Sequence, residues 1–469
     1  MLDKDISRDF RFEKDTLGEV RVPADKLWGA QTQRSLDNFK IGHCRIPLEM
    51  IRALAIVKKA AAFANHEKNK ISLQKRDLIA QVCDEIATGT LDEQFPLVVW
   101  QTGSGTQTNM NINEVIANRA EVLLHGQVTG TNKFLSPNDD VNCSQSTNDV
   151  FPTAMRVATA KGIIEKLLPA LHEFMSSIQE KEKEFQGIVK IGRTHLMDAT
   201  PLLLSQEFSA FCSQIAHGTS MLQRSLTSLM ELPIGGTAVG TGLNAPRGYD
   251  ALTVGFINDF TGHQFTVADN KFEAMASHDA FVEVSSALKR LAVSCMKIAN
   301  DFRLLSSGPR CGLGEISLPA NEPGSSIMPG KVNPTQCEAL SMVCCQVIGN
   351  DAAIVAGAMH GHLQLNVFMP LIAHNILTSC CLLTDALRSF DTKCLRGITI
   401  NKEKIDHYLH HSLMLVTALN PHIGYANAAK IAQHAHARNI TLKEAALELK
   451  LTTAEEFDQW ITEGMKITL

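Results

Sequence analysis

Apolar side chains recur every three or four residues through the middle of the chain, which is the spacing of one face of an α-helix. Pro169 lies inside the first of these stripes, and because the pattern continues past it we expect a kink there and not a helix end. With an apolar run at 339–359, the stripes predict five long helical segments between about residues 150 and 392. The stripes cover residues 164–178, 208–229, 288–302 and 371–387.

Signals for β-strands are sparse, with only three tyrosines and three tryptophans and no repeated alternation of apolar and polar positions. The predicted fold is therefore mainly α, a three-domain subunit whose central domain, 144–402, is a long helical bundle. Residues 1–143 predict an N-terminal domain of short helices and loops, and 403–469 a small C-terminal helical domain. In the last, Thr453 and Glu456 have the spacing of a capping box.

The apolar run ALSMVCCQVIGNDAAIVAGAM, 339–359, is long enough to span a bilayer. Gln346, Asn350 and Asp351 interrupt its middle, and such groups are costly in lipid. A helix that is apolar on nearly every side is more simply buried within protein. We therefore expect this helix at the centre of an assembly larger than one subunit.

The chain of 469 residues is 45% hydrophobic and 20% charged, with a net charge of −5 and a pI near 6.4. No global charge attracts nucleic acid or an anionic membrane, so neither is an expected partner and an anionic ligand must be held by a local site. Twelve cysteines are spread over the chain without a C-x-x-C motif, which predicts reduced thiols. The opening residues, 1–15, do not resemble a signal peptide. We expect a cytoplasmic protein, or alternatively one of the mitochondrial matrix after processing.

Four polar loops lie between apolar segments of the chain, and their side chains are suited to binding one anionic ligand. Hydroxyl and amide groups are neutral donors for carboxylate oxygens, Lys331 adds a charged donor, and His195 can transfer protons near neutral pH. A small dianionic acid fits this set, and no metal or other cofactor is required. The loops are QTGSGTQTNMN (101–111), SPNDDVNCSQSTND (136–149), IGRTHLMDATP (191–201) and GSSIMPGKVNP (324–334).

Each feature also has a structural interpretation when it is taken alone. Ser146, Thr147 and Asn148 precede a predicted helix, where such residues usually cap the backbone. A single histidine such as His195 is more often a hydrogen-bonded structural residue, and Lys331 alone is more often a solvated charge. The run GGTAVGTG, 235–242, lacks a dinucleotide fingerprint and is interpreted as a packing or turn segment.

The fourth loop, GSSIMPGKVNP, resembles the signature loop of the fumarase/aspartase superfamily. The class II, iron-independent fumarases in particular are resembled by the other three loops and by NKFEAMASHDA, SGPRCGLGEI and HSLMLVTALNPHIGY. The likeness runs from about residue 12 to 460. It implies a homotetramer with a core of twenty helices, in which each active site draws loops from three subunits.

The resemblance also implies reversible conversion of fumarate to (S)-malate by a carbanion-type anti elimination and addition, with residue roles that match position by position. Ser325 is the base for the carbon-bound proton, and His195, paired with Glu338 of a different subunit, handles the departing water. Because serine is a weak base, a Ser325 that only binds substrate is the alternative interpretation. The matching substrate-binding positions are Ser104, Thr106, Ser146, Thr147, Asn148, Thr194, Ser326, Lys331 and Asn333.

Aspartate ammonia-lyase, or another fumarate-releasing lyase of the superfamily, is the alternative activity. Those siblings usually carry glutamine at the position of His195, whereas this chain keeps histidine. Gln364 leans the other way, because fumarases usually have glutamate there, and Met369 and Met197 also depart from the fumarase pattern. A non-catalytic superfamily member is a third hypothesis, and the intact Ser325, His195 and Lys331 argue against it.

A peripheral dicarboxylate site of the family is usually built on His-Pro-Asn-Asp. The corresponding residues here are Ser136, Pro137, Asn138 and Asp139, with Lys133 nearby. Because an imidazole donor has been lost, we expect binding at Ser136, Asn138 and Asp139 to be weakened or absent.

Overall fold

The computed structural model describes residues 10–128 and 133–465, and its contacts divide the chain into two compact units. Unit 1 comprises the chain up to Leu168 together with 220–290 and 345–383. Unit 2 comprises 169–219, 291–344 and the chain from Thr384 onward. The predicted division into domains 1–143, 144–402 and 403–469 stays a prediction.

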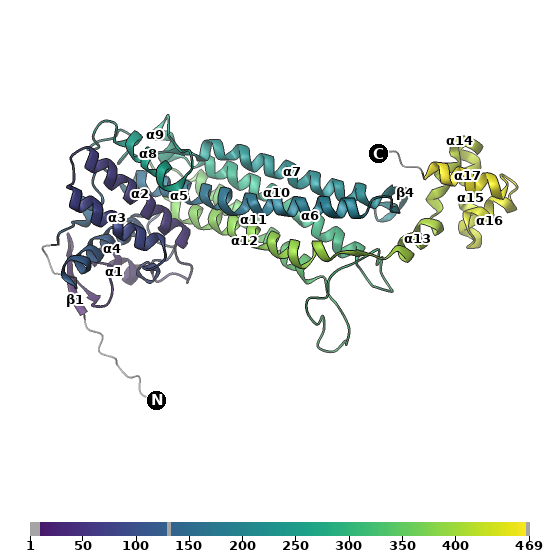
Figure 1. Ribbon diagram of the computed structural model, residues 1–469, viewed down its shortest axis with the longest axis horizontal. Coiled ribbons are helices and arrows are strands. Elements are labelled where there is room, and N and C mark those ends of the chain that lie inside the picture. The colour runs from purple at the N-terminus through teal and green to yellow at the C-terminus, as the bar shows by residue number, and fades with distance from the viewer. Residues whose placement is uncertain (1–9, 129–132, 466–469) are drawn as a thin grey trace. The chain divides into compact units, whose positions relative to one another are not determined.

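Long helices dominate the described chain (Figure 1), which confirms the predicted mainly α fold. The five longest stretches coincide with the five apolar stripes. They are α5 (Thr147–Gly162) continuing through η3 (Ile163–Leu167) into α6 (Leu168–Glu184), then α7 (Leu204–Leu229), α10 (Asp279–Leu305), α11 (Thr335–Met359) and α12 (Met369–Lys393).

The remaining elements of unit 1 are short strands and helices of the N-terminal region and of the 230–276 segment. They are β1 (Phe10–Asp15), β2 (Gly18–Pro23), α1 (Ala30–Asn38), α2 (Leu48–Glu67), α3 (Leu73–Ala87), η1 (Asp92–Gln94), α4 (Thr106–His125), η2 (Pro137–Val141), β5 (Glu231–Leu232), α8 (Tyr249–Thr261), β6 (Thr266–Val267) and α9 (Lys271–Ala276).

Unit 2 adds a hairpin, a two-residue strand pair and the C-terminal helices. They are β3 (Val189–Thr194), β4 (Met197–Leu203), β7 (Ile316–Ser317), η4 (Leu395–Gly397), β8 (Thr399–Ile400), α13 (Lys402–His411), η5 (Leu413–Leu419), α14 (Asn420–Ile423), α15 (Tyr425–Arg438), α16 (Leu442–Glu448) and α17 (Ala454–Gly464). The predicted capping box at Thr453 and Glu456 begins α17.

The helix around Pro169 continues, as the apolar pattern predicts, and the adjustment is a π-helical turn at Ile163–Leu167. Proline has no backbone N–H to donate to the preceding turn, and a π-helical turn is one way in which a helix accommodates such a gap. The first helices differ from the prediction. The N-terminal helices are not uniformly short, since α2 and α4 each have 20 residues.

In unit 2 the long helices pack through aromatic rings. Phe302 of α10 stacks on Phe208 of α7 with ring centroids 5.6 Å apart and on Phe390 of α12 at 5.8 Å. Phe174 of α6 meets the ring of Phe390 edge-on at 5.9 Å. Each of these rings has no exposed surface, so four helices share one aromatic core.

In unit 1 the polar residues that interrupt α11 are paired with neighbouring helices. Asp351 accepts hydrogen bonds from Ser285 at 2.7 Å and from Lys289 at 2.5 Å, both on α10. Asn350 donates to the Ser379 hydroxyl of α12 at 3.0 Å. These partners satisfy the groups that would be costly in lipid.

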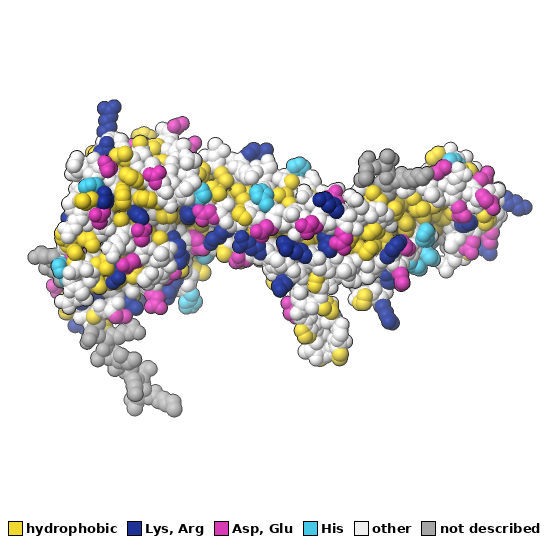
Figure 2. Space-filling model, viewed as in Figure 1, with side chains coloured by type: hydrophobic (Ala, Val, Ile, Leu, Met, Phe, Trp, Pro, Cys, Tyr) yellow, Lys and Arg dark blue, Asp and Glu magenta, His cyan; other side chains and the backbone are white. Residues whose placement is uncertain are grey.

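One face of α11 is exposed in the single chain, and burial of this helix at the centre of a larger assembly stays a prediction. The helix is buried along one side only, and Met342, Ile348 and Met359 are 68%, 39% and 73% exposed. By length and composition two spans, Thr335–Met359 and Met369–Gly397, are apolar enough to cross a membrane, with mean hydropathies of 1.5 and 1.3. On the face shown in Figure 2, charged side chains of both signs are interspersed, and neither sign dominates.

Candidate active site

The first polar loop turns sharply into α4. Gly105 is the residue before the helix and has φ of 75°, and a Cβ there would lie 2.3 Å from the ring of Phe151. Only glycine fits both conditions. The turn brings the hydroxyls of Ser104 and Thr106 to 2.9 Å from each other, half-buried. Two predicted substrate-binding hydroxyls are therefore neighbours in the structure.

The second loop caps α5. The Ser146 hydroxyl accepts from the backbone N–H of Asn148 at 3.2 Å, and the Asp149 carboxylate accepts from the backbone N–H of Ser146 at 2.9 Å. Ser146 is thus a helix cap, as the structural interpretation requires. The Thr147 hydroxyl accepts from the Asn109 side-chain amide at 3.0 Å. Asn109 lies one turn into α4, so this bond ties the second loop to the first.

Asp149 is fully buried and organises a third segment. Its Oδ2 accepts from the backbone N–H groups of Gly235 and Thr237, each at 2.9 Å. Burial raises the pKa of the Asp149 carboxyl to about 6, while these N–H bonds oppose the rise. The GGTAVGTG segment, 235–242, is therefore a turn wrapped on a carboxylate, in agreement with its structural interpretation. Asn148 also reaches this segment, because its side chain donates to the carbonyl of Ala238 at 2.8 Å.

The third loop is a β-hairpin whose tip carries His195. Thr194 pairs with Met197, and His195 and Leu196 between them have φ of 56° and 61°. Two positive φ angles are those of a two-residue type I′ turn, which usually takes Asn-Gly. The His195 side chain is therefore exposed at the tip of the hairpin, on a residue whose left-handed backbone conformation is uncommon for residues other than glycine.

The base of this hairpin is held by a buried carboxylate that sequence reasoning did not single out. Glu315, 1% exposed, forms ion pairs with Arg193 at 2.6 Å and Lys190 at 2.9 Å. Lys190 also pairs with Glu207 of α7 at 2.9 Å. Glu315 belongs to SGPRCGLGEI, one of the family-like motifs, so that motif was the available signal.

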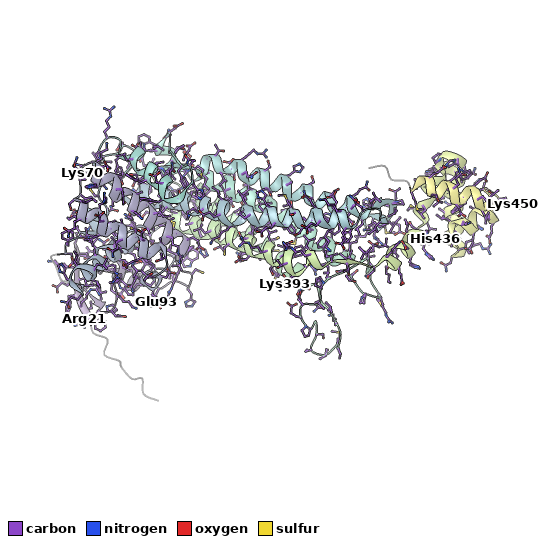
Figure 3. All side chains as sticks on the ribbon, viewed as in Figure 1. Arg21, Lys70, Glu93, Lys393, His436 and Lys450 are labelled. Atoms are coloured by element: carbon purple, nitrogen blue, oxygen red, sulfur yellow. The ribbon has the colours of Figure 1, made fainter. Side chains whose placement is uncertain are left out.

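The signature loop closes on itself through its backbone. The Asn333 side chain donates to the carbonyl of Gly324 at 2.6 Å, and the Gly324 N–H donates to the carbonyl of Lys331 at 2.8 Å. A Cβ on Gly324 would lie 2.4 Å from that carbonyl oxygen, so glycine is required. The loop is steadied at its start by Asn321, which donates to the carbonyl of Lys393 at 2.8 Å (Lys393 is labelled in Figure 3).

Inside this loop the Ser325 hydroxyl oxygen accepts two backbone N–H groups, from Ile327 at 3.2 Å and Met328 at 3.0 Å. Donors aimed at an oxygen favour its negatively charged form. Ser325 is half-buried, whereas Ser326 and Lys331 are exposed. The two bonds favour the deprotonated form of the Ser325 hydroxyl, and its role as the base stays a prediction.

Comparison with known proteins agrees with these motifs. A family model described as "Lyase" matches residues 18–349, and one described as "Fumarase C C-terminus" matches 415–463. The class II fumarate hydratase of Pasteurella multocida is 59% identical over 453 residues, which cover 96% of this chain and 97% of that protein. The chain belongs to the class II fumarate hydratase family.

Two further relatives extend the likeness. The mitochondrial fumarate hydratase of Dictyostelium discoideum is 56% identical over 454 residues, 96% of this chain and 93% of that protein. The crystal structure of class II fumarase from Schistosoma mansoni superposes with a TM-score of 0.94 at 45% identity, covering 98% of this chain and 99% of that one. Family, fold class and the hydro-lyase class predicted from the motifs are thereby confirmed.

Among the described residues, the predicted site residues fall into two sets. Unit 1 holds Ser104, Thr106, Ser146, Thr147 and Asn148, and unit 2 holds Thr194, His195, Ser325, Ser326, Lys331, Asn333 and Glu338. Glu338 lies exposed in the first turn of α11, one turn after Asn333. The pairing of Glu338 with His195 of another subunit stays a prediction. No group of three or more metal-binding side chains is found in the part of the chain that the structure describes.

At the predicted peripheral site the polar groups are engaged with one another. The Ser136 hydroxyl donates to the Asp139 carboxylate at 2.9 Å and accepts from the backbone N–H of Asp139 at 3.1 Å. Lys133 pairs with Glu13 at 2.6 Å, and Asn138 is exposed. These bonds compete with a dicarboxylate, which favours the prediction of weakened binding.

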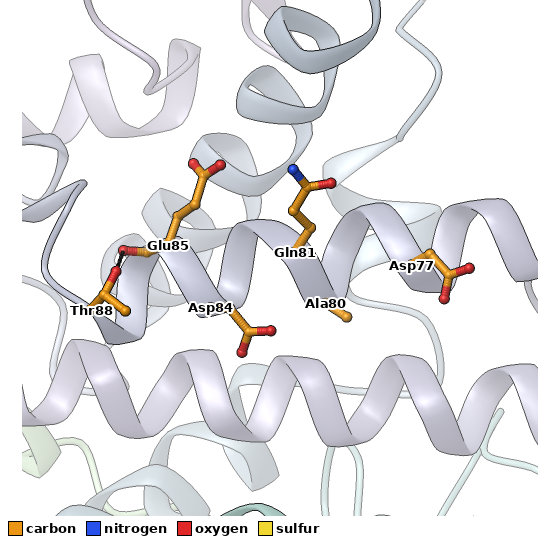
Figure 4. A pocket seen from close by; sticks show the side chains of 6 residues that line it. All are labelled: Asp77, Ala80, Gln81, Asp84, Glu85 and Thr88. Carbon is orange, nitrogen blue, oxygen red and sulfur yellow. Dashed lines mark hydrogen bonds between the residues drawn. The ribbon is translucent and has the colours of Figure 1, made fainter.

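A hollow of about 550 Å³ on α3 is lined by none of the predicted site residues (Figure 4). Asp77, Asp84 and Glu85 line it, with Asp84 paired to Lys59 and Glu85 to Arg119, each at 2.7 Å. The Asp84 and Glu85 carboxylates are engaged with these cations and none of the lining residues is a predicted site position, so the hollow is not a candidate substrate site.

Proposed function

We propose that this chain catalyses the reversible hydration of fumarate to (S)-malate at a site built from the loops described above. The observation that carries the proposal is the Ser325 hydroxyl oxygen, which accepts two backbone N–H groups in a loop that also carries Lys331 and Asn333. A proton acceptor beside a cation suits a reaction that removes a proton from carbon next to a carboxylate.

In the direction of dehydration, Ser325 in its alkoxide form takes the proton from the malate carbon beside one carboxylate. The electron pair of that C–H bond moves into the carboxylate, which becomes more negative. Lys331 and Asn333 donate hydrogen bonds there, and donors placed where charge develops lower the barrier. The double bond then forms as the hydroxyl group leaves the neighbouring carbon on the opposite face. His195, polarised by Glu338, gives that oxygen a proton, so that water departs.

Neutral donors hold the rest of the substrate. We assign the carboxylate contacts to the hydroxyl and amide groups of the remaining predicted positions. These are Ser104, Thr106, Ser146, Thr147, Asn148, Thr194 and Ser326. The Ser146 hydroxyl accepts from backbone N–H groups in the first turn of α5, which leaves its own proton available to a carboxylate. No cofactor has a role in this scheme.

We further propose a homotetramer in which each site takes loops from three subunits. The support is the outward face of α11, where Met342 and Met359 are exposed in a single chain although the helix is apolar. An apolar face of this kind is stabilised by burial against further copies. Under this proposal neither apolar span lies in a membrane, and the protein is cytoplasmic like a soluble metabolic enzyme.

The three departures from the fumarase pattern lie in different settings. Met369 is fully buried at the start of α12, where its N–H donates to the carbonyl of Gly103 at 2.9 Å. Met197 is 70% exposed beside the hairpin turn. Gln364 lies in an exposed turn closed by the pairing of His362 with Leu365, and it is the one observation that favours an ammonia-lyase.

Hydration in D₂O tests the proposal. We expect fumarate to give malate with a single deuterium, placed anti to the new hydroxyl group, because base and acid act on opposite faces. Proton NMR of the product reads the position from the coupling between the two carbon-bound protons. Malate labelled syn, or labelled on both faces in the first turnovers, would contradict the assigned roles, and absence of malate would contradict the activity.

A further inference from the structure

A buried lysine lies beneath the second loop, outside every predicted site position. Lys58 of α2 has no exposed surface, and its ammonium donates to the side-chain oxygens of Asn142 at 2.9 Å and Gln145 at 3.0 Å. Burial lowers the pKa of Lys58 to about 7, opposed mainly by the charge of Asp149. A buried cation is costly, and a methionine of similar length would fill the same space at lower cost.

The ammonium helps to fix how the amides around it are turned. It has three donors and no acceptor, so Asn142 and Gln145 present their oxygen atoms to it, and the Asn142 NH₂ group donates to the carbonyl of Gln145 at 3.2 Å. The same Asn142 oxygen accepts from the side-chain amides of Asn109 at 3.2 Å and Asn113 at 3.3 Å. Both of these asparagines must therefore point their NH₂ groups inward.

The orientation of the Asn109 amide in turn decides whether the Thr147 hydroxyl accepts or donates a hydrogen bond on that side. The Asn109 NH₂ group that faces Asn142 also donates to the Thr147 oxygen at 3.0 Å. A hydroxyl that accepts from one side offers its own proton on another. The Oδ1 atoms of Asn109 and Asn113 have no hydrogen-bond partner among the described residues, so their orientation does not serve the asparagines themselves. Their orientation follows that of Asn142, which Lys58 and the Gln145 carbonyl hold together.

We propose that Lys58 is a positioning residue that makes Thr147 a hydrogen-bond donor toward a substrate carboxylate. The inference rests on the proposed function, since it assigns a polarity to one contact of that same site. Without the ammonium, only the 3.2 Å bond to the Gln145 carbonyl opposes a turn of the Asn142 NH₂ group toward Asn109, and Asn109 can then turn its oxygen toward Thr147. Thr147 would donate inward and would present only lone pairs to an anion.

A double-mutant cycle tests this chain of hydrogen bonds. We expect Lys58→Met to raise KM for fumarate about tenfold, with a smaller change in kcat, because one hydrogen bond to the bound substrate is lost. Thr147→Val is expected to raise KM similarly, and the double variant to match Thr147→Val alone, because both act through one hydroxyl. Lys59→Met is the matched control, since the neighbouring Lys59 pairs at the surface with Asp84.

The outcomes separate the two proposals. Wild-type KM in a folded Lys58→Met variant, or additive effects in the double variant, overturns the positioning role while the activity stands. A wild-type chain that does not convert fumarate overturns the proposed function and this inference with it. If Lys58→Met fails to fold, Asn109→Asp carries the test, because a carboxylate at that place accepts from Thr147 and must also raise KM.

Discussion

Ser325→Ala is expected to lower kcat by about 10²–10⁴-fold, the range that a positioned proton-transfer group contributes. The Ser325 oxygen receives two backbone N–H groups, and both donors lie in an exposed loop, so their loss of a partner costs little stability. The change should therefore appear in kcat at an unchanged melting temperature. Steady-state rates of fumarate hydration, measured beside thermal unfolding, provide the comparison.

Ser326→Ala is the matched variant in the same loop. Ser326 is exposed and is proposed to bind substrate only, so its loss should act mainly on KM. If Ser325→Ala changes KM alone, as Ser326→Ala should, then Ser325 only binds substrate and the base is another group. That result would favour the alternative interpretation of this serine.

His195→Asn is expected to lower kcat by about 10²–10⁴-fold through loss of the group that protonates the departing oxygen. Asparagine tolerates the left-handed conformation, so the change keeps φ of 56° while it removes the imidazole. The hairpin should therefore keep its fold. Steady-state rates of fumarate hydration, measured beside thermal unfolding, check this result.

Leu196→Gly is the control for the hairpin turn. Leu196 has φ of 61° and is 73% exposed, and glycine relieves that strain without touching a proposed site group. We expect activity close to that of the wild type and no loss of stability. If His195→Asn retains near-wild-type kcat with a folded hairpin, the imidazole does not transfer the proton.

The helical bundle could be predicted from the sequence because its signal is local. A stripe such as Phe208 to Leu229 repeats the helical period over many turns, and the structure places α7 on the same residues. The hairpin at 191–201 could not be predicted in this way. Its two-residue turn uses His195 and Leu196 where Asn-Gly is usual, so the strongest short-range signal of a hairpin is missing.

The candidate site residues could be predicted from sequence motifs, whereas the buried residues that hold the site loops in place could not. Glu315 and Lys58 carry ordinary charged side chains, and only three-dimensional packing reveals that both are buried among partners from distant segments. The two faces of α11 are both apolar, but one is buried in the chain and the other is exposed, and this difference is visible only in the structure. Sequence periodicity reports a face only when the opposite face is polar.

Release of fumarate from malate, followed by its ultraviolet absorbance with aspartate in parallel, tests the central claim most directly. We predict that the purified chain forms fumarate from malate and none from aspartate, because His195 stands where the ammonia-lyases usually carry glutamine. Fumarate formed from aspartate would contradict that assignment and would make Gln364 the better guide. Failure with both substrates, from a folded protein, would contradict the proposed activity itself.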